Sequence, residues 1–98
     1  MKVEVSNSTL KIVGNIKSIG DFQEIKNALD TMKNTHKSIS LSIVDSISMT
    51  SSVVGYLVKL IHKDGVNVSI SLGDKRLYSL LEELGLVSEF NVKVVNFS

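Results

Sequence analysis

The 98-residue sequence contains no cysteine and no proline. Without cysteine the chain can form no disulfide, thiolate metal site or thiolate nucleophile, and nothing points to an oxidising compartment. The chain also has no low-complexity segment and no internal repeat, so we expect a single domain over residues 1–98. An apolar fraction of 43% with a charged fraction of 21% is typical of a globular domain that buries one modest core.

Long apolar runs and charge of one sign are missing too. The best apolar run, residues 53–61, is interrupted by Lys59 and falls well short of the roughly 20 residues that span a bilayer. The first residues alternate apolar and polar side chains, unlike a secretory signal. Eleven basic and ten acidic residues are mixed along the chain, so the sequence predicts no large region of positive potential that could bind nucleic acid. We expect a cytoplasmic protein that neither binds nucleic acid nor inserts into a membrane.

Motifs for catalysis and metal binding are also absent. The two histidines, His36 and His62, have no partner at metal-ligand spacing, and residues 73–76 lack the upstream glycine of a phosphate-binding loop. The adjacent Glu82 and Glu83 point in different directions on a predicted helix, so they form no paired-carboxylate site. We therefore expect a protein that is not an enzyme and that holds no metal or cofactor.

The first third of the chain predicts a hairpin followed by a helix. Residues 2–6 and 9–13 predict two short strands joined by a tight turn. Ser18 and Asp21 have the spacing of a capping box, in which each residue satisfies a free backbone N–H group of the other. An apolar stripe at three- and four-residue intervals then predicts one-sided packing on a sheet. The stripe consists of Phe22, Ile25, Leu29 and Met32.

The rest of the chain alternates between strand and helix patterns. Residues 39–43 and 66–72 have the two-residue period of strands, and residues 53–64 have a helical pattern that Gly65 can end. Asp74 is a good N-cap for a third helix, which Gly85 closes before a last strand at residues 92–97.

This order, ββαβαβαβ, defines the expected fold class. The strand-helix-strand unit in the middle predicts parallel pairing of its two strands. We expect an α/β fold in which one mixed sheet is layered with helices.

The second helix has one apolar and one polar arc. At about 100° per residue, the apolar arc is the broader one, so we expect this helix to be the most deeply packed. The apolar arc holds Val53, Val54, Leu57, Val58, Leu60 and Ile61, and the polar arc holds Gly55, Lys59, His62 and Lys63.

A hydroxyl-rich stretch, Thr50, Ser51 and Ser52, stands at the start of this helix. A serine or threonine here can cap the helix by accepting a hydrogen bond from a free N–H group, which is worth about 1 kcal/mol. Gly55 does not fit a purely structural interpretation, because glycine inside a helix costs roughly 1 kcal/mol relative to alanine. On the polar arc it would let another backbone approach closely.

The stretch and its surroundings resemble the STAS family, the fold of bacterial anti-sigma-factor antagonists. In that family a strand and loop ending in a phosphorylatable Asp-Ser-Ser-Gly-Leu-Gly motif lead directly into a helix. Residues 39–45 stand where that strand would be, and residues 50–55, Thr-Ser-Ser-Val-Val-Gly, stand where the motif would be. Residues 75–86 are similar to the family's third helix and its terminal Gly-Leu, so the resemblance covers nearly the whole chain.

The resemblance implies a switch. In the family, a serine kinase that doubles as the anti-sigma factor phosphorylates the first serine of the motif, and a metal-dependent serine phosphatase removes the group. Carried over, the phosphorylated residue is Ser51, with Ser52 and Thr50 as alternates and Ser52 as the expected helix cap. The resemblance thus implies a non-enzymatic regulatory module that exchanges protein partners. Its partner-binding residues are Ser51, Ser52, Val53, Gly55, Tyr56 and Lys59.

An alternative function stays open. Thr50 replaces the aspartate of the motif, Val53 replaces its first glycine, and Lys17 stands where family members often carry an aspartate. These substitutions favour a STAS subunit that never carries phosphate, such as a component of a membrane transporter or signalling scaffold. The same helix surface would then be a permanent docking face.

Overall fold

The computed structural model describes residues 1–97 and has the predicted element order, ββαβαβαβ. The strands are β1 (Lys2–Ser6), β2 (Thr9–Val13), β3 (Ser38–Ile43), β4 (Asn67–Leu72) and β5 (Val92–Val94). The helices are α1 (Ile19–Met32), α2 (Ser51–His62) and α3 (Lys75–Glu83).

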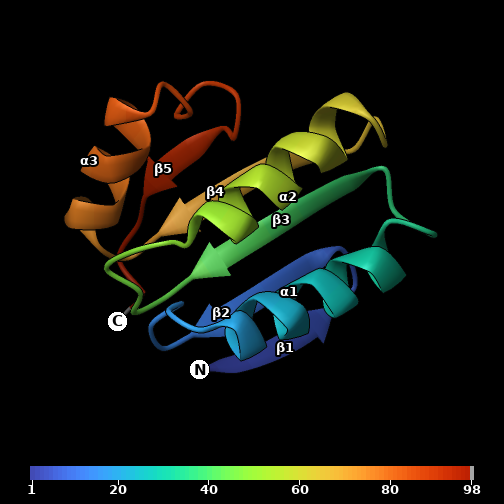
Figure 1. Cartoon of the computed structure of the whole chain (residues 1–98), viewed down its shortest axis with the longest axis horizontal. Coiled ribbons are helices and arrows are strands. Elements are labelled where there is room, and N and C mark those ends of the chain that lie inside the picture. The colour runs from blue at the N-terminus through green and yellow to red at the C-terminus, as the bar shows by residue number, and fades with distance from the viewer. Residues whose placement is uncertain (98) are drawn as a thin grey trace.

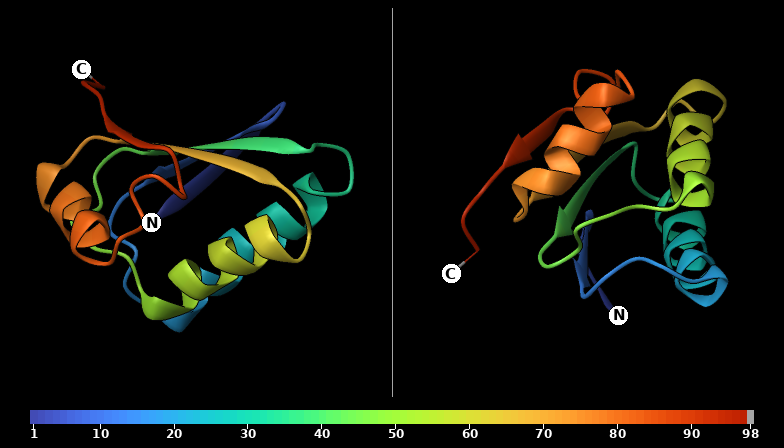
Figure 2. Two further views of the ribbon diagram at one scale, coloured as in Figure 1. Left: turned by 90° about the horizontal axis from the view of Figure 1, so that it is seen from above. Right: turned by 60° about the vertical axis from the view of Figure 1, so that its left-hand side comes forward.

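The five strands form one mixed sheet in the order β1-β2-β3-β4-β5. β1 pairs antiparallel with β2, and β2, β3, β4 and β5 run parallel to one another. Each parallel connection passes through a helix, the usual form of such crossovers. All three helices lie on the same side of the sheet (Figures 1 and 2), so the fold has two layers. The prediction of an α/β fold with a mixed sheet is confirmed.

The predicted capping residues lie at the starts of α1 and α3, and the predicted glycines follow α2 and α3. The Ser18 hydroxyl accepts a hydrogen bond from the Asp21 N–H at 3.0 Å, and the Asp21 carboxylate accepts one from the Ser18 N–H at 3.1 Å. Asp74 caps α3 through the N–H of Arg76. Gly65 and Gly85 follow α2 and α3 with φ of 66° and 73°, in the left-handed region that glycine reaches without strain.

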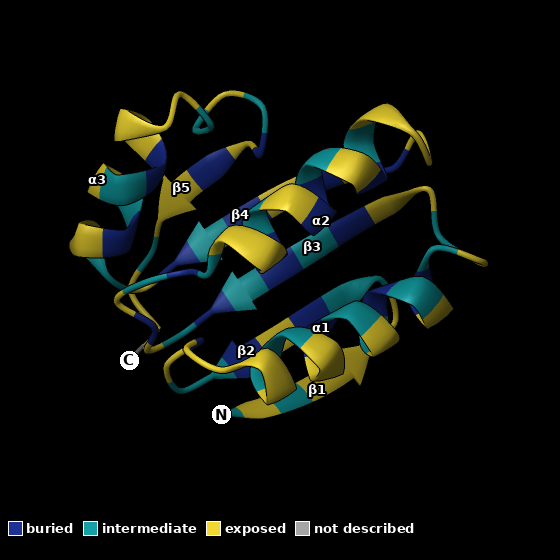
Figure 3. Ribbon diagram, in the orientation of Figure 1, coloured by how far each residue is buried: buried dark blue, intermediate teal, exposed yellow. Residues whose placement is uncertain are grey.

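The core lies between the sheet and the helices, and the opposite face of the sheet is polar. Along β3 and β4, buried residues alternate with half-buried or exposed ones (Figure 3). The serines of the two strands face away from the helices, where Ser40 lies opposite Ser69 and their hydroxyls are 3.3 Å apart. The apolar residues of the same strands are all buried: Ile39, Leu41, Ile43, Val68, Ile70 and Leu72.

Several boundaries differ from the prediction, most clearly those of α2 and β5. α2 begins at Ser51, two residues before the apolar pattern starts, because Thr50 caps it. β5 ends at Val94 rather than at residue 97, after which the Val95 N–H still donates to the Leu72 carbonyl at 2.8 Å. None of the helices in residues 1–97 has the length and apolar character needed to cross a membrane.

Candidate functional site

The start of α2 is organised by Thr50. Its backbone is extended (φ −74°, ψ 155°), and its hydroxyl accepts a hydrogen bond from the Val53 N–H at 3.3 Å. The expectation that Ser52 caps the helix is therefore corrected. Ser52 lies inside the first turn, where its backbone is already helical, and its side chain is exposed.

Ser51, the predicted phosphorylation site, is the first helical residue and is exposed. The first N–H groups of any helix have no intrahelical partner, and among residues 1–97 no other group accepts a hydrogen bond from the N–H of Ser51 or Ser52. The first turn of α2 contains no acidic residue. This end of the helix thus suits a negatively charged group, because the helix dipole places partial positive charge there.

A mostly apolar groove of about 400 Å³ lies beside Ser51, between the start of α2 and the end of α3. Leu84 is 54% exposed, so apolar surface is left uncovered next to the serine hydroxyl. Apart from the adjacent residues and the backbone of α2 itself, no atom of residues 1–97 lies within 4 Å of the position that a Cβ on Gly55 would occupy, so the helix is open to approach there. The groove is lined by Met49, Ser51, Val54, Gly55, Leu80 and Leu84.

Two of the predicted partner-binding residues, Val53 and Tyr56, are in the core instead. Val53 is 2% exposed and Tyr56 is 7% exposed. The Tyr56 hydroxyl donates a hydrogen bond to Asp30 of α1, and its ring packs edge-on against Phe22 with 6.4 Å between ring centroids. Because Val53 is buried in the core and α1 covers Tyr56, these two side chains offer a partner little surface, and the docking face is corrected to exclude them.

Charged groups surround Tyr56 at the seam between α1 and α2. The Lys26 Nζ lies 2.7 Å from the Asp30 Oδ2. The hydrogen bond from Lys26 is the largest cause that lowers the pKa of Asp30, and the hydrogen bond from Tyr56 is the next. Burial, helped by Asp30, raises the pKa of the Tyr56 hydroxyl. The Lys59 Nζ lies 5.3 Å from the ring centroid of Tyr56 and 3.3 Å from the Asp64 Oδ2. Lys59 is thus held at the seam while its side chain remains 43% exposed.

Ser46 fixes the loop that leads to the site, a role that the sequence did not reveal. This buried hydroxyl accepts a hydrogen bond from the Ile16 N–H at 3.0 Å and donates one to the Ser48 carbonyl at 2.6 Å. Nearby, the Asn15 side chain accepts a hydrogen bond from the Ile47 N–H at 3.1 Å. The loops after β2 and β3 are therefore tied together. In a serine-rich sequence nothing distinguishes Ser46 from the exposed serines.

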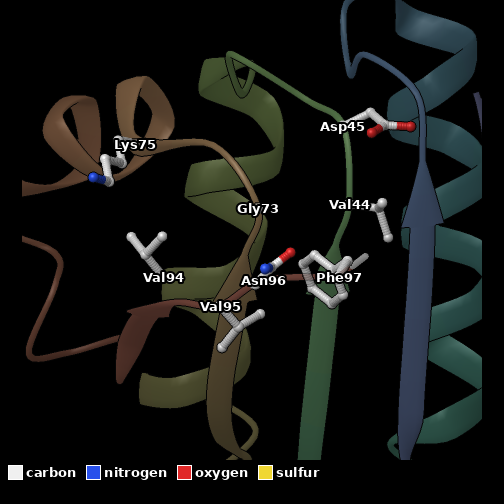
Figure 4. Close-up of a pocket in the computed structure, with 8 residues that line it drawn as sticks. All are labelled: Val44, Asp45, Gly73, Lys75, Val94, Val95, Asn96 and Phe97. Carbon is white, nitrogen blue, oxygen red and sulfur yellow. The ribbon is translucent and has the colours of Figure 1, made fainter.

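A second hollow, of about 530 Å³, lies at the carboxyl ends of β3, β4 and β5 (Figure 4). Ligands often bind at this edge of a parallel sheet. The charged side chains do not converge here, because Asp45 and Lys75 lie on opposite sides and their charged ends point apart. The lining residues are Val44, Asp45, Gly73, Lys75, Val94, Val95, Asn96 and Phe97. No group of three or more potential metal ligands occurs in the described part of the chain.

Comparison of the chain with protein-family models, with curated proteins and with solved structures finds no match. The resemblance to the STAS family therefore rests on the residues of the sequence itself.

Proposed function

We propose that the chain is a STAS-like regulatory module that binds a protein partner at the start of α2 and releases it when Ser51 is phosphorylated. The observation that carries this proposal is the exposed Ser51 at the first position of α2, beside an uncovered apolar groove. The resemblance implies the partners, which are a serine kinase that doubles as an anti-sigma factor and a metal-dependent serine phosphatase.

The local structure can accept a phosphate on Ser51 without losing a contact. The cap is supplied by Thr50, so the Ser51 hydroxyl is not needed to hold the helix. A phosphate adds about −1.5 to −2 charges. The helix dipole and the N–H groups of Ser51 and Ser52 favour that charge, so the domain stays folded when the residue is modified.

The same phosphate would oppose a bound partner. An apolar side chain of the partner that filled the groove between Val54 and Leu84 would exclude water from the side of the groove where Ser51 lies. A dianion there would have to give up its water, and that desolvation costs a few kcal/mol unless the partner supplies compensating cations. The complex then separates although neither protein unfolds.

Incubation with the serine kinase that forms a complex with this chain, in the presence of ATP, tests the proposal. We expect the mass of the chain to rise by one phosphate, mapped to Ser51 by fragmentation. Ser51→Ala should abolish the modification, whereas the matched control Ser52→Ala should retain it. A chain that binds the kinase at full stoichiometry and stays unmodified, or that is modified only at Ser52, contradicts the proposal.

A second candidate function is a docking subunit that never carries phosphate. Thr50 caps α2 and Val53 is buried, so both residues that depart from the family's motif have roles inside the fold. Neither role depends on a phosphate. In this second proposal the groove and the flank at Gly55 hold a permanent partner, and the kinase experiment leaves the chain unmodified.

A further inference from the structure

β1 forms one outer edge of the sheet, and within residues 1–97 no other strand pairs with that edge. In the strand order β1 has a single neighbour, β2, and four of its five residues are exposed. The other outer strand, β5, has only three residues. An open edge presents unpaired backbone N–H and C=O groups that can pair with a strand of another molecule. β1 is thus the longer of the two edges at which another strand can add.

The hairpin determines which backbone groups of β1 point outward. Ser6 and Thr9 are register partners across a two-residue turn, so they form the hydrogen-bonded pair next to it. Hydrogen-bonded pairs alternate along an antiparallel ladder, so Glu4 and Lys2 also direct their backbone groups toward β2. The N–H and C=O groups of Val3 and Val5 therefore point away from the sheet.

The charges on β1 select one register for a second copy of the chain. Two copies of β1 related by a two-fold axis pair antiparallel, and centring the pair on Val3 places Lys2 of each copy opposite Glu4 of the other. Shifting the pairing by two residues places Lys2 opposite Lys2, or Glu4 opposite Glu4, which is repulsive. Only the register centred on Val3 brings together opposite charges and outward-pointing backbone groups.

We infer that β1 is a homodimer interface, in which two copies join their sheets edge to edge through antiparallel pairing centred on Val3. In one chain the Lys2 Nζ already lies 3.1 Å from the Glu4 Oε1, and the dimer extends this pair into a cluster of four alternating charges. On the helix side, Val5, which is 54% exposed, lies opposite Met1 of the second copy and is covered.

The inferred dimer leaves the site on α2 free. β2 and α1 lie between β1 and α2 (Figure 1), so pairing at this edge does not occlude Ser51. The inference therefore stands independently of the proposed function. A five-residue strand buries less surface than a standard interface, so we expect a weak dimer.

Mixing two charge-reversed variants tests the inference directly. Sedimentation velocity over a series reaching millimolar concentration should show reversible dimerisation of the native chain. Lys2→Glu alone and Glu4→Lys alone should each dimerise about tenfold more weakly, because like charges then face each other across the interface. An equimolar mixture of the two variants should recover the native affinity as a heterodimer, since Glu faces Lys again at every position.

The control is Lys93→Glu on β5, which reverses an exposed charge far from β1 and should leave dimerisation unchanged. The mixture separates the inferred contact from any effect within one hairpin, where Glu4 also lies opposite Lys11. A native chain that stays monomeric throughout overturns the inference. So does a mixture that associates no better than its two components.

Discussion

At the scale of single residues, Ser51 and Tyr56 have opposite environments although both lie on α2. Ser51 is exposed beside the groove, whereas Tyr56 is covered by α1. A buried hydroxyl is tolerated only when it is hydrogen-bonded, and Asp30 accepts that bond. We conclude that Tyr56 anchors α2 to α1 and that Ser51 is the residue open to modification.

Asp30→Asn should weaken this anchor. Because hydrogen bonds from Lys26 and Tyr56 lower its pKa, the Asp30 carboxylate stabilises the fold above its unfolded-state pKa of about 3.9. That contribution is lost as the pH falls through the lower folded-state pKa. Urea unfolding should show a loss of about 1 kcal/mol at pH 7 that shrinks in strong acid. Glu24→Gln, an exposed change on the same helix, should have no effect at either pH.

The sequence did not predict the burial of Tyr56, and the reason is physical. The predicted apolar arc included Val54, Val58 and Ile61, all of which are only half-buried. Periodicity shows that a helix has an apolar side, but it does not show where a neighbouring helix packs. α1 packs against the edge of this apolar arc, so the buried side of α2 includes Tyr56, and Val54 is left half-buried. The half-buried Val54 is consequently left to line the groove.

At the scale of elements, the ends of the helices were the best predicted features. The capping box at Ser18, the cap at Asp74 and the glycines after α2 and α3 each have a local chemical signature, and each is confirmed. The start of α2 was harder, because three consecutive hydroxyl residues can all cap a helix. The extended backbone of Thr50 and the hydrogen bond that its hydroxyl accepts from the Val53 N–H identify it as the cap.

Thr50→Val should therefore destabilise α2. The valine keeps the shape of the side chain but cannot accept the hydrogen bond from the Val53 N–H. We expect the free energy of unfolding to fall by about 1 kcal/mol, measured by thermal or urea denaturation. Ser52→Ala is the matched control and should change it by much less. An equal loss in both variants would show that Ser52 shares the capping role.

At the scale of the whole molecule, one layer of helices leaves the sheet with a polar open face and two outer edges. The sequence predicted the order of elements and the parallel pairing of β3 with β4. It did not predict that β1 is an outer strand, because alternation shows which face of a strand is buried but not which strands are its neighbours. The charges of Lys2 and Glu4 can select a register with a second copy only because β1 is an outer strand.

The position of Ser51 relative to the groove also depends on how the whole chain folds. Met49 comes from the loop before α2 and Val54 from its first turn, whereas Leu80 and Leu84 come from α3 and its end. Segments far apart in the sequence thus form one surface. A partner that binds there contacts the site of modification and the apolar groove together.

The affinity of the partner kinase for the chain with Ser51→Asp tests this central proposal most directly. Aspartate carries part of the charge of a phosphate, so titration calorimetry should show binding at least about tenfold weaker than to the native chain. The free energy of unfolding should not fall, because the helix dipole favours a negative charge at this position. Ser79→Asp, which places the same charge on exposed α3 surface outside the groove lining, should bind as the native chain does. Equal affinity of the native chain and the Ser51→Asp variant would contradict the proposal that Ser51 controls the partner.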